Sequence, residues 1–129
     1  MSVAAHAQST YGLNTRTLKT PRDIEYEIIA RITGRIQAQL PHQKGRTSAE
    51  LISALNDNRQ LWTAFAADLA SSGNAFPQDL RSRLFYLAEF TIRHTSQVLS
   101  GTALADPLVD INTSVMRGLR GQQALSWPG

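Results

Sequence analysis

The sequence predicts an all-α fold, a small bundle of about four helices built round a long antiparallel helical hairpin. Apolar side chains recur every three or four residues over long stretches, helix-start residues precede these stretches, and the alternating patterns of strands are missing. With 129 residues, 42% of them hydrophobic and 18% charged, the chain is large enough for one core. We expect a flexible leader over 1–19, a single helical domain over 20–121 and a tail over 122–129.

The first helix is expected to begin after Thr20, with Pro21 at its first position, and to end at Pro41. An apolar residue recurs at every fourth position, which gives one buried face: Ile24, Ile28, Ile32, Ile36 and Leu40. Gly34 lies inside this helix. It either weakens the helix by about 1 kcal/mol relative to alanine or permits a close helix crossing.

The second helix is expected to begin at a capping box formed by Thr47 and Glu50. Its stripe follows at spacings of three and four: Leu51, Leu55, Asn58, Trp62, Phe65 and Leu69. Residues 72–74, Ser-Gly-Asn, should end it, because glycine and asparagine accept the left-handed backbone that closes many helices.

The third helix is expected to open at Pro77 and to run to Gly101. Its stripe is Leu80, Leu84, Leu87, Thr91, His94 and Val98. A loop of about five residues joins two helices of similar length, so the second and third helices should fold back on each other as an antiparallel hairpin.

The fourth helix is predicted by Asp106 and Pro107, which repeat the combination of cap and proline. Its apolar face is Leu108, Ile111, Val115 and Leu119. Gly118 and Gly121 are expected to bracket its end, which gives a helix about 20 Å long. The tail that follows carries Trp127.

Several classes of site are absent from the composition. The chain has no cysteine, which excludes disulfides, thiolate metal sites and cysteine nucleophiles. His6, His42 and His94 lie in separate segments without a second ligand at helical spacing, so we expect no metal. His94 falls on an apolar stripe, where a hydrogen-bonded core or boundary histidine is expected.

Four carboxylates resemble acid–base pairs, but each fits a solvated helix face or a helix start: Asp57, Asp68, Asp106 and Asp110. We therefore expect no enzyme activity, no catalytic residue and no cofactor. No secretory signal or membrane-spanning stretch is recognisable, so we expect a soluble, cytoplasmic protein.

Two features exceed what a simple core needs. Asn58 lies among apolar residues, so it either sets the register of the helices, the favoured interpretation, or lines a surface left open for a ligand. Further apolar residues lie off the main stripes: Ile52, Leu61, Phe85, Phe90, Ile92, Val109 and Met116. Either other helices of the chain cover them or they form a groove for an amphipathic helix of another protein.

Several short segments carry a family resemblance. Residues 54–64 read Ala-Leu-Asn-Asp-Asn-Arg-Gln-Leu-Trp-Thr-Ala. Others occur in order along the chain: Tyr11-Gly12, Thr20-Pro21-Arg22-Asp23, Gly73-Asn74, Leu87-Ala88-Glu89-Phe90, Arg93-His94, Pro107-Leu108, Asp110-Ile111-Asn112 and Met116-Arg117-Gly118-Leu119. Together these segments resemble the FlaF family of flagellar biosynthesis regulators.

The resemblance implies a cytoplasmic, non-enzymatic factor required for flagellin production or export by type III secretion. It implies an export chaperone of flagellin that works alongside FlbT, a protein associated with flagellin messenger RNA. An amphipathic terminal helix of flagellin is the expected ligand. We hypothesise these contact residues: Tyr11, Arg59, Trp62, Phe85, Phe90, Asn112 and Met116.

The alternative is an RNA-associated post-transcriptional regulator that acts with FlbT. Residues 1–46 hold seven basic and three acidic residues, a balance of +4, whereas 47–129 hold six and seven, a balance of −1. The N-terminal cations that contact phosphates in this alternative are Arg16, Lys19, Arg22, Arg31 and Arg35. A surplus without a basic run makes direct nucleic-acid binding the lesser expectation. The sequence leaves open the oligomeric state, the flagellin segment bound, and whether regulation is direct.

Overall fold

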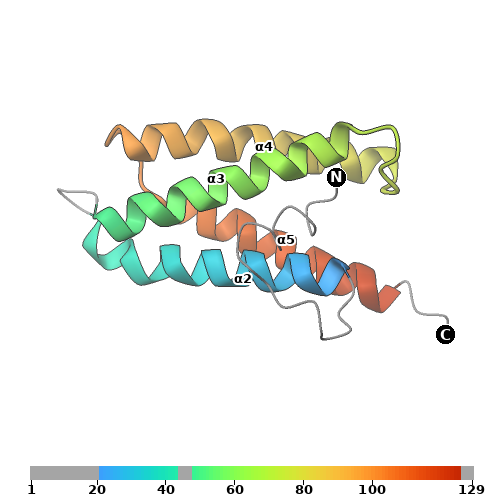
Figure 1. The fold of residues 1–129 in the computed structure, drawn as a ribbon, viewed down its shortest axis with the longest axis horizontal. Coiled ribbons are helices and arrows are strands. Elements are labelled where there is room, and N and C mark those ends of the chain that lie inside the picture. Colours follow the sequence, from blue (N-terminus) through green and yellow to red (C-terminus); the bar gives the residue numbers. More distant parts are fainter. Residues whose placement is uncertain (1–20, 44–47, 126–129) are drawn as a thin grey trace.

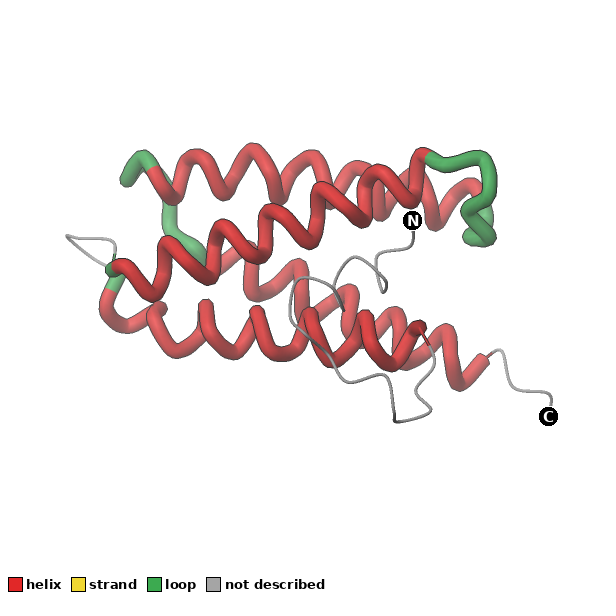
Figure 2. Tube along the Cα trace, viewed as in Figure 1, coloured by secondary structure: helices red, strands yellow, loops and turns green. Residues whose placement is uncertain are grey.

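The computed structural model describes the backbone of residues 21–43 and 48–125, and the side chains of 25–43 and 48–118. Within these ranges it contains four long helices and no strand, which confirms the all-α prediction (Figures 1 and 2). The helices are α2 (Pro21–Gln39), α3 (Ala49–Ala70), α4 (Gln78–Leu99) and α5 (Asp106–Leu125), with a short 3-10 turn, η1 (Leu40–His42), after α2.

The bundle consists of two helix pairs joined through α3. The expected hairpin is present, because α3 and α4 pack closely along their lengths. Helix α2 packs on α5 and on α3, whereas α4 touches α5 over a smaller area and lies at one side of the molecule (Figure 1). The core therefore lies between the α3–α4 pair and the α2–α5 pair.

Helix α2 follows the predicted pattern. Pro21 is its first residue, and Ile28, Ile32 and Ile36 are buried. The α-helix gives way to η1 just before Pro41, since proline lacks the N–H that a further α-turn requires. The close crossing considered at Gly34 is wrong, because this residue is exposed and a Cβ there would meet nothing within 4 Å.

Helix α3 begins one residue later than predicted. Ser48, in extended backbone, is the N-cap, and its Oγ accepts a hydrogen bond from the Leu51 amide at 3.0 Å. The same hydroxyl donates to Gln39 Oε1 at 3.0 Å, which ties the start of α3 to the end of α2. The predicted box of Thr47 and Glu50 is therefore wrong: Ser48 already caps the helix, and Glu50 is its second residue.

The predicted left-handed end of α3 is also wrong. Ser71 closes the helix in extended backbone, and no positive φ occurs at Gly73 or Asn74. Instead, the Asn74 amide nitrogen donates to the main-chain carbonyl and to Oδ2 of Asp68, both at 3.3 Å, while its oxygen accepts from the Phe76 amide at 2.9 Å. The Asn74 side chain thus closes the end of α3 in place of the predicted left-handed backbone.

Helix α4 has the left-handed end that was expected of α3. Gly101 has a φ of +84°, and its amide donates to the Val98 carbonyl at 3.0 Å. The Thr102 amide donates to the Gln97 carbonyl at 2.9 Å. These two bonds form a Schellman motif, which favours glycine at the left-handed position.

Helix α5 is longer than predicted. It starts at Asp106 and continues through Gly118 and Gly121 to Leu125, so residues 122–125 of the predicted tail are helical. A glycine with helical backbone costs only about 1 kcal/mol, which weakens a helix without ending it. Trp127 and the leader over 1–19 lie outside the described residues.

One side chain joins the two connections at the same end of the bundle. Gln43, after η1, donates from Nε2 to Asp106 Oδ1 at 2.8 Å. Its Oε1 accepts from the Ala105 amide at 3.0 Å. The α2–α3 connection is thereby attached to the start of α5.

Candidate partner-binding surface

A polar cluster occupies the centre of the bundle. Asn112 on α5 accepts a hydrogen bond from Trp62 Nε1 at 2.9 Å, and its Nδ2 donates to Asn58 Oδ1 at 2.9 Å and to Thr33 Oγ1 at 3.1 Å. The four residues are at most 3% exposed. Because these bonds join α2, α3 and α5, Asn58 is a register contact and not part of an open surface.

This burial corrects two of the proposed partner contacts. Trp62 is 1% exposed and Asn112 is fully buried, so a bound protein cannot reach either side chain while the helices stay together. Both are core residues in this fold. The tryptophan side chain reaches from α3 towards α5, where its N–H donates to Asn112.

The hairpin side of the centre contains buried polar atoms without partners. Asn58 Nδ2 on α3 and Thr91 Oγ1 on α4 have no hydrogen-bond partner among the described residues. Thr95, one turn along α4, donates to the Thr91 carbonyl at 2.7 Å. An unsatisfied buried group costs about 1–3 kcal/mol, so these two atoms are less well satisfied than the amide cluster around Asn112.

The other proposed partner contacts lie at or near the surface. Phe85 on α4 is 36% exposed, whereas Phe90 on α4 and Met116 on α5 are half-buried. Arg59 on α3 is half-buried and donates to Asn56 Oδ1 at 2.7 Å. Tyr11 lies outside the described residues. Of the seven proposed residues, the structure joins only Trp62 and Asn112 by a hydrogen bond among those it describes.

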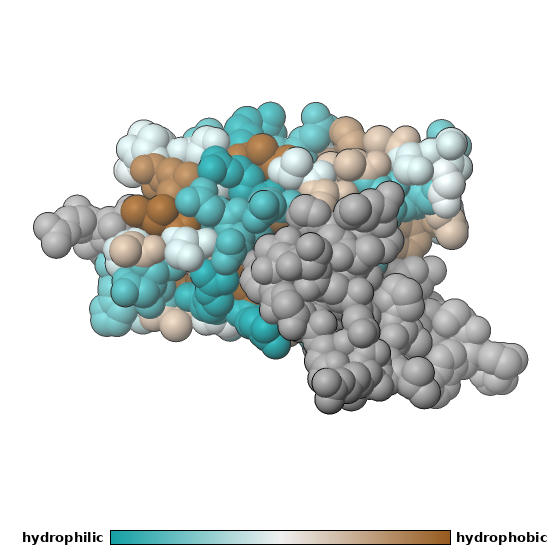
Figure 3. All heavy atoms as spheres, viewed as in Figure 1, coloured by the Kyte–Doolittle hydropathy of each residue, from teal (hydrophilic) through white to brown (hydrophobic). Residues whose placement is uncertain are grey.

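The chain covers only part of its surplus apolar surface. Leu61 and Val109 are buried by neighbouring helices, and Ile92 is half-buried. Ile52, at the start of α3, stays 39% exposed. Figure 3 shows hydrophobic surface at the end of the bundle where α3 begins and α4 ends.

The first half of α4 exposes aromatic side chains. None of residues 78–87 is fully buried, and Tyr86 is 63% exposed beside Phe85. The fully buried residues of α4 are all small or medium in size and lie in its second half: Ala88, Thr91, Thr95 and Val98. Helix α4 is therefore anchored by its second half and leaves the outer face of its first half uncovered.

Four residues follow this outer face at helical spacing and define the α4 outer stripe: Arg83, Tyr86, Phe90 and Arg93. The Phe90 ring stacks on His94, with centroids 5.3 Å apart and planes 14° apart. His94 Nε2 in turn bonds the Leu104 carbonyl at 2.8 Å. This confirms the prediction of a hydrogen-bonded boundary histidine.

Sequence reasoning missed Arg83 and Tyr86. Tyr86 lies on the side of α4 away from its apolar stripe, where a single aromatic residue resembles ordinary surface. The available signal was its spacing of four from Phe90 and three from Arg83, which places all three on one face.

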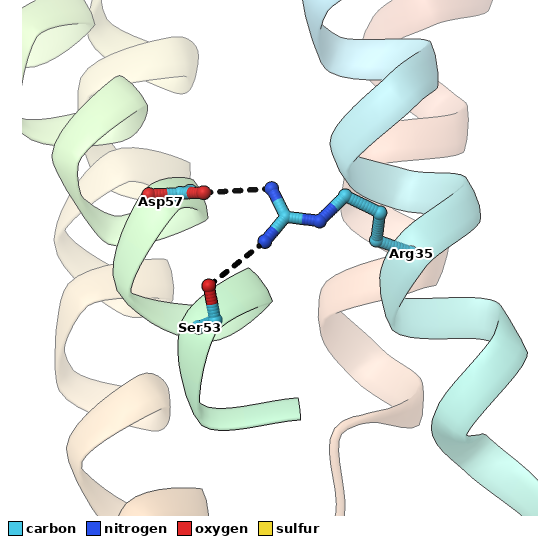
Figure 4. Close-up of polar contacts among 3 residues, drawn as sticks. All are labelled: Arg35, Ser53 and Asp57. Carbon is cyan, nitrogen blue, oxygen red and sulfur yellow. Dashed lines mark hydrogen bonds and ion pairs between the residues drawn. The ribbon is translucent and has the colours of Figure 1, made fainter. Parts of the chain in front are cut away.

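Helices α2 and α3 are joined by an ion pair beside a hollow. Arg35 donates from Nη1 to Asp57 Oδ2 at 2.6 Å and from Nη2 to Ser53 Oγ at 3.1 Å (Figure 4). The hollow has a volume of about 440 Å³ and is open to solvent. Its lining is Arg35, Ala38, Gln39, Ala49, Glu50 and Ser53.

This ion pair bears on the RNA alternative. Arg35 is already held by a carboxylate, so its charge is partly compensated. Arg31 is exposed on α2. Arg16, Lys19 and the Arg22 side chain lie outside the described part of the chain. Of the five cations of this alternative, the structure describes the side chains of two, and one of these is already paired.

Three of the four carboxylates considered for acid–base chemistry have structural contacts. Asp57 pairs with Arg35, Asp68 accepts from Asn74, and Asp106 accepts from Gln43. In residues 21–43 and 48–125, histidine and carboxylate side chains form no group of three that is suited to a metal ion. None of the helices in the same ranges combines the length and apolar character needed to span a bilayer.

Comparison with known proteins gives one match. No curated protein and no solved structure matches the chain. The family model described as "Flagellar protein FlaF" matches residues 7–119, which is most of the chain and includes all four long helices in whole or in large part. With its all-α bundle and this match over nearly its full length, the chain belongs to the FlaF family of flagellar proteins.

Proposed function

We propose that this FlaF-family protein is a non-enzymatic accessory factor that binds flagellin in the cytoplasm before export and so promotes flagellum assembly. Family membership supplies the flagellar context. The observation that carries the binding role is the uncovered first half of α4, where Phe85 and Tyr86 are 36% and 63% exposed. Aromatic side chains exposed next to each other are typical of surfaces that bind other proteins.

Flagellin is the proposed partner because its terminal segments are amphipathic and unfolded before assembly. Such a segment folds as a helix when its apolar face meets a complementary surface, and the ordering cost keeps the complex reversible. A chaperone of an exported protein needs this reversibility. The half-buried Phe90 and Met116 belong to the proposed contact surface, whereas Trp62 and Asn112 support it from the core.

A second protein partner, FlbT, belongs to the same proposal. A complex with FlbT would link bound flagellin to flagellin messenger RNA without direct RNA contact by this chain. Direct RNA binding can be distinguished by its salt dependence, because the affinity of phosphate contacts falls steeply as the salt concentration rises. A gel shift with flagellin leader RNA at two salt concentrations, with and without flagellin, distinguishes these routes.

The experiment that tests flagellin binding compares two variants of nearly equal exposure. Phe85→Ser removes an exposed aromatic residue on α4, and Ile52→Ser removes an exposed apolar residue at the start of α3. We expect the full-length chain to capture flagellin at moderate salt, Phe85→Ser to weaken capture about tenfold, and Ile52→Ser to leave it unchanged. Failure of the unaltered chain to bind flagellin would contradict the proposal.

A further inference from the structure

We propose that the α4 outer stripe is the docking site for an acidic amphipathic helix. In this complex, carboxylates of the partner helix pair with Arg83 and Arg93, and its apolar residues pack on Tyr86 and Phe90. The inference rests on the proposed function, to which it adds a face of α4 next to Phe85 and the chemistry of the flagellin segment.

The spacing of the stripe suits one helix lying along another. Arg83 and Arg93 are ten positions apart, which is about 15 Å along the helix axis, and the two aromatic residues lie between them. A partner helix therefore needs apolar side chains over about two turns with an acidic residue beyond each end. Bidentate contacts of the two guanidinium groups with carboxylates would also set the position of the partner helix along α4.

The charges of the stripe are available to a partner. Arg83 and Arg93 are exposed, and neither makes an ion pair with any described residue. Asp79 and Glu89 precede them by four positions, a spacing that permits pairing, yet neither carboxylate lies within ion-pair distance. The stripe itself therefore presents two unpaired cations, one beyond each end of its aromatic centre, with Asp79 and Glu89 as neighbouring anions.

Phe90, one of the two aromatic residues of the stripe, is held in place before any partner binds. Phe90 stacks on His94, which is fixed by its bond to the Leu104 carbonyl. Leu104, in the α4–α5 connection, is 50% exposed and adds apolar area close to the end of the stripe. A preformed surface loses little entropy on binding, which favours a well-defined docking geometry.

Charge complementarity selects this occupant over two others. In a symmetric pair of antiparallel α4 helices, the arginines of one stripe would lie near those of the other, and like charges in contact oppose association. A nucleic acid would also approach Asp79 and Glu89, which flank the stripe and repel phosphates. A partner helix can avoid both obstacles, because it can place carboxylates opposite the two arginines alone, whereas a nucleic acid carries a phosphate at every nucleotide.

The test uses the full-length chain with two designed amphipathic peptides and with cognate flagellin. The two peptides share one leucine face. They differ only in the residue beyond each end of that face, which is Glu at both ends of one peptide and Lys at both ends of the other. We expect fluorescence anisotropy to show that the Glu peptide binds about tenfold more tightly. The double variant R83E/R93E should reverse this preference, and the control Arg31→Glu, at an exposed position on α2, should retain it.

Flagellin binding separates this inference from the function on which it rests. We expect R83E/R93E to weaken flagellin binding about tenfold or more. Equal binding of flagellin to both proteins would overturn the docking site and leave the proposed function standing, whereas no binding to the unaltered chain would overturn both. Equal affinity for the two peptides, or a dimer that Tyr86→Ala dissociates, would also overturn the inference. Circular dichroism verifies that the exposed substitutions leave the helices intact.

Discussion

The centre of the bundle and the outer face of α4 distribute their side chains in opposite ways. The centre buries amides and hydroxyls, with Asn58 and Asn112 fully inaccessible. The outer face of α4 leaves Phe85 and Tyr86 in contact with solvent. In most small domains polar residues face solvent and aromatic residues fill the core, so both regions depart from the common pattern.

The difference separates what specifies the fold from what is available for binding. The buried amides allow one register of α2, α3 and α5, because any other would leave them without hydrogen bonds. Tyr86 in the α4 outer stripe satisfies no such requirement, since residues 78–87 of α4 bury no side chain completely. Substitutions in the two regions should therefore affect different measurements.

The largest effect is expected for Trp62→Ala. The ring is 1% exposed, packs against Phe65 with centroids 5.6 Å apart, and donates to Asn112. Its loss should lower the free energy of unfolding by about 3–5 kcal/mol, measured by urea denaturation. A Trp62→Ala protein that keeps its stability but fails to bind flagellin would return this residue to the binding surface.

A double-mutant cycle on Asn58 and Asn112 comes next. Asn112→Leu leaves Asn58 Oδ1 and Trp62 Nε1 unpaired, so we expect a loss of about 3 kcal/mol in the free energy of unfolding. In the double variant with Asn58→Leu, both amides are gone, and the total loss should fall at least about 1 kcal/mol short of the sum of the single losses. Strict additivity would mean that the two amides do not cooperate.

Thr91→Val tests the unpaired hydroxyl at the interface of α3 and α4. Removing a buried group without a partner should raise the free energy of unfolding by about 1 kcal/mol. Thr95→Val is the matched control one turn away, where the hydroxyl does donate to a carbonyl and its loss brings no gain. If thermal and urea unfolding show no difference between the two variants, the Thr91 hydroxyl has a partner.

The smallest effect on stability is expected for Tyr86→Ser. With 63% of the residue exposed, the change should alter the free energy of unfolding by no more than about 0.5 kcal/mol. Binding of the Glu peptide should weaken in the same protein. A large loss of stability would show that Tyr86 belongs to the core, and the contrast between the two regions would disappear.

The sequence predicted the helices well and their ends less well. Periodicity located all four long helices, and the proline positions located the starts of α2, α4 and α5 to within one residue. The helix ends depend on capping interactions, which the apolar periodicity does not reveal. The N-cap of α3 is Ser48, one residue after the predicted Thr47. At the other end of α3, the Asn74 side chain takes the place of the predicted left-handed backbone.

The candidate site was predicted only in part, for a physical reason. A helical stripe shows that Trp62 and Asn58 share a face, but not how deeply a neighbouring helix covers that face. Burial of Trp62 and Asn112 depends on how the α2–α5 pair packs on the α3–α4 pair, a long-range arrangement. Tyr86 is exposed because no described helix packs on that face of α4. A local sequence pattern does not predict which face a neighbouring helix leaves uncovered.

The two hydrogen bonds of Gln43 indicate when this end of the bundle is completed during folding. Its amide reaches residues 62 and 63 positions further along the chain, so both bonds can close only after the α3–α4 hairpin has brought the two ends of the intervening segment together. Contacts of such long sequence separation form late in folding, because the entropy of closing the segment must first be overcome. Protection of the Ala105 amide from hydrogen exchange is therefore a marker of chains in which assembly is complete.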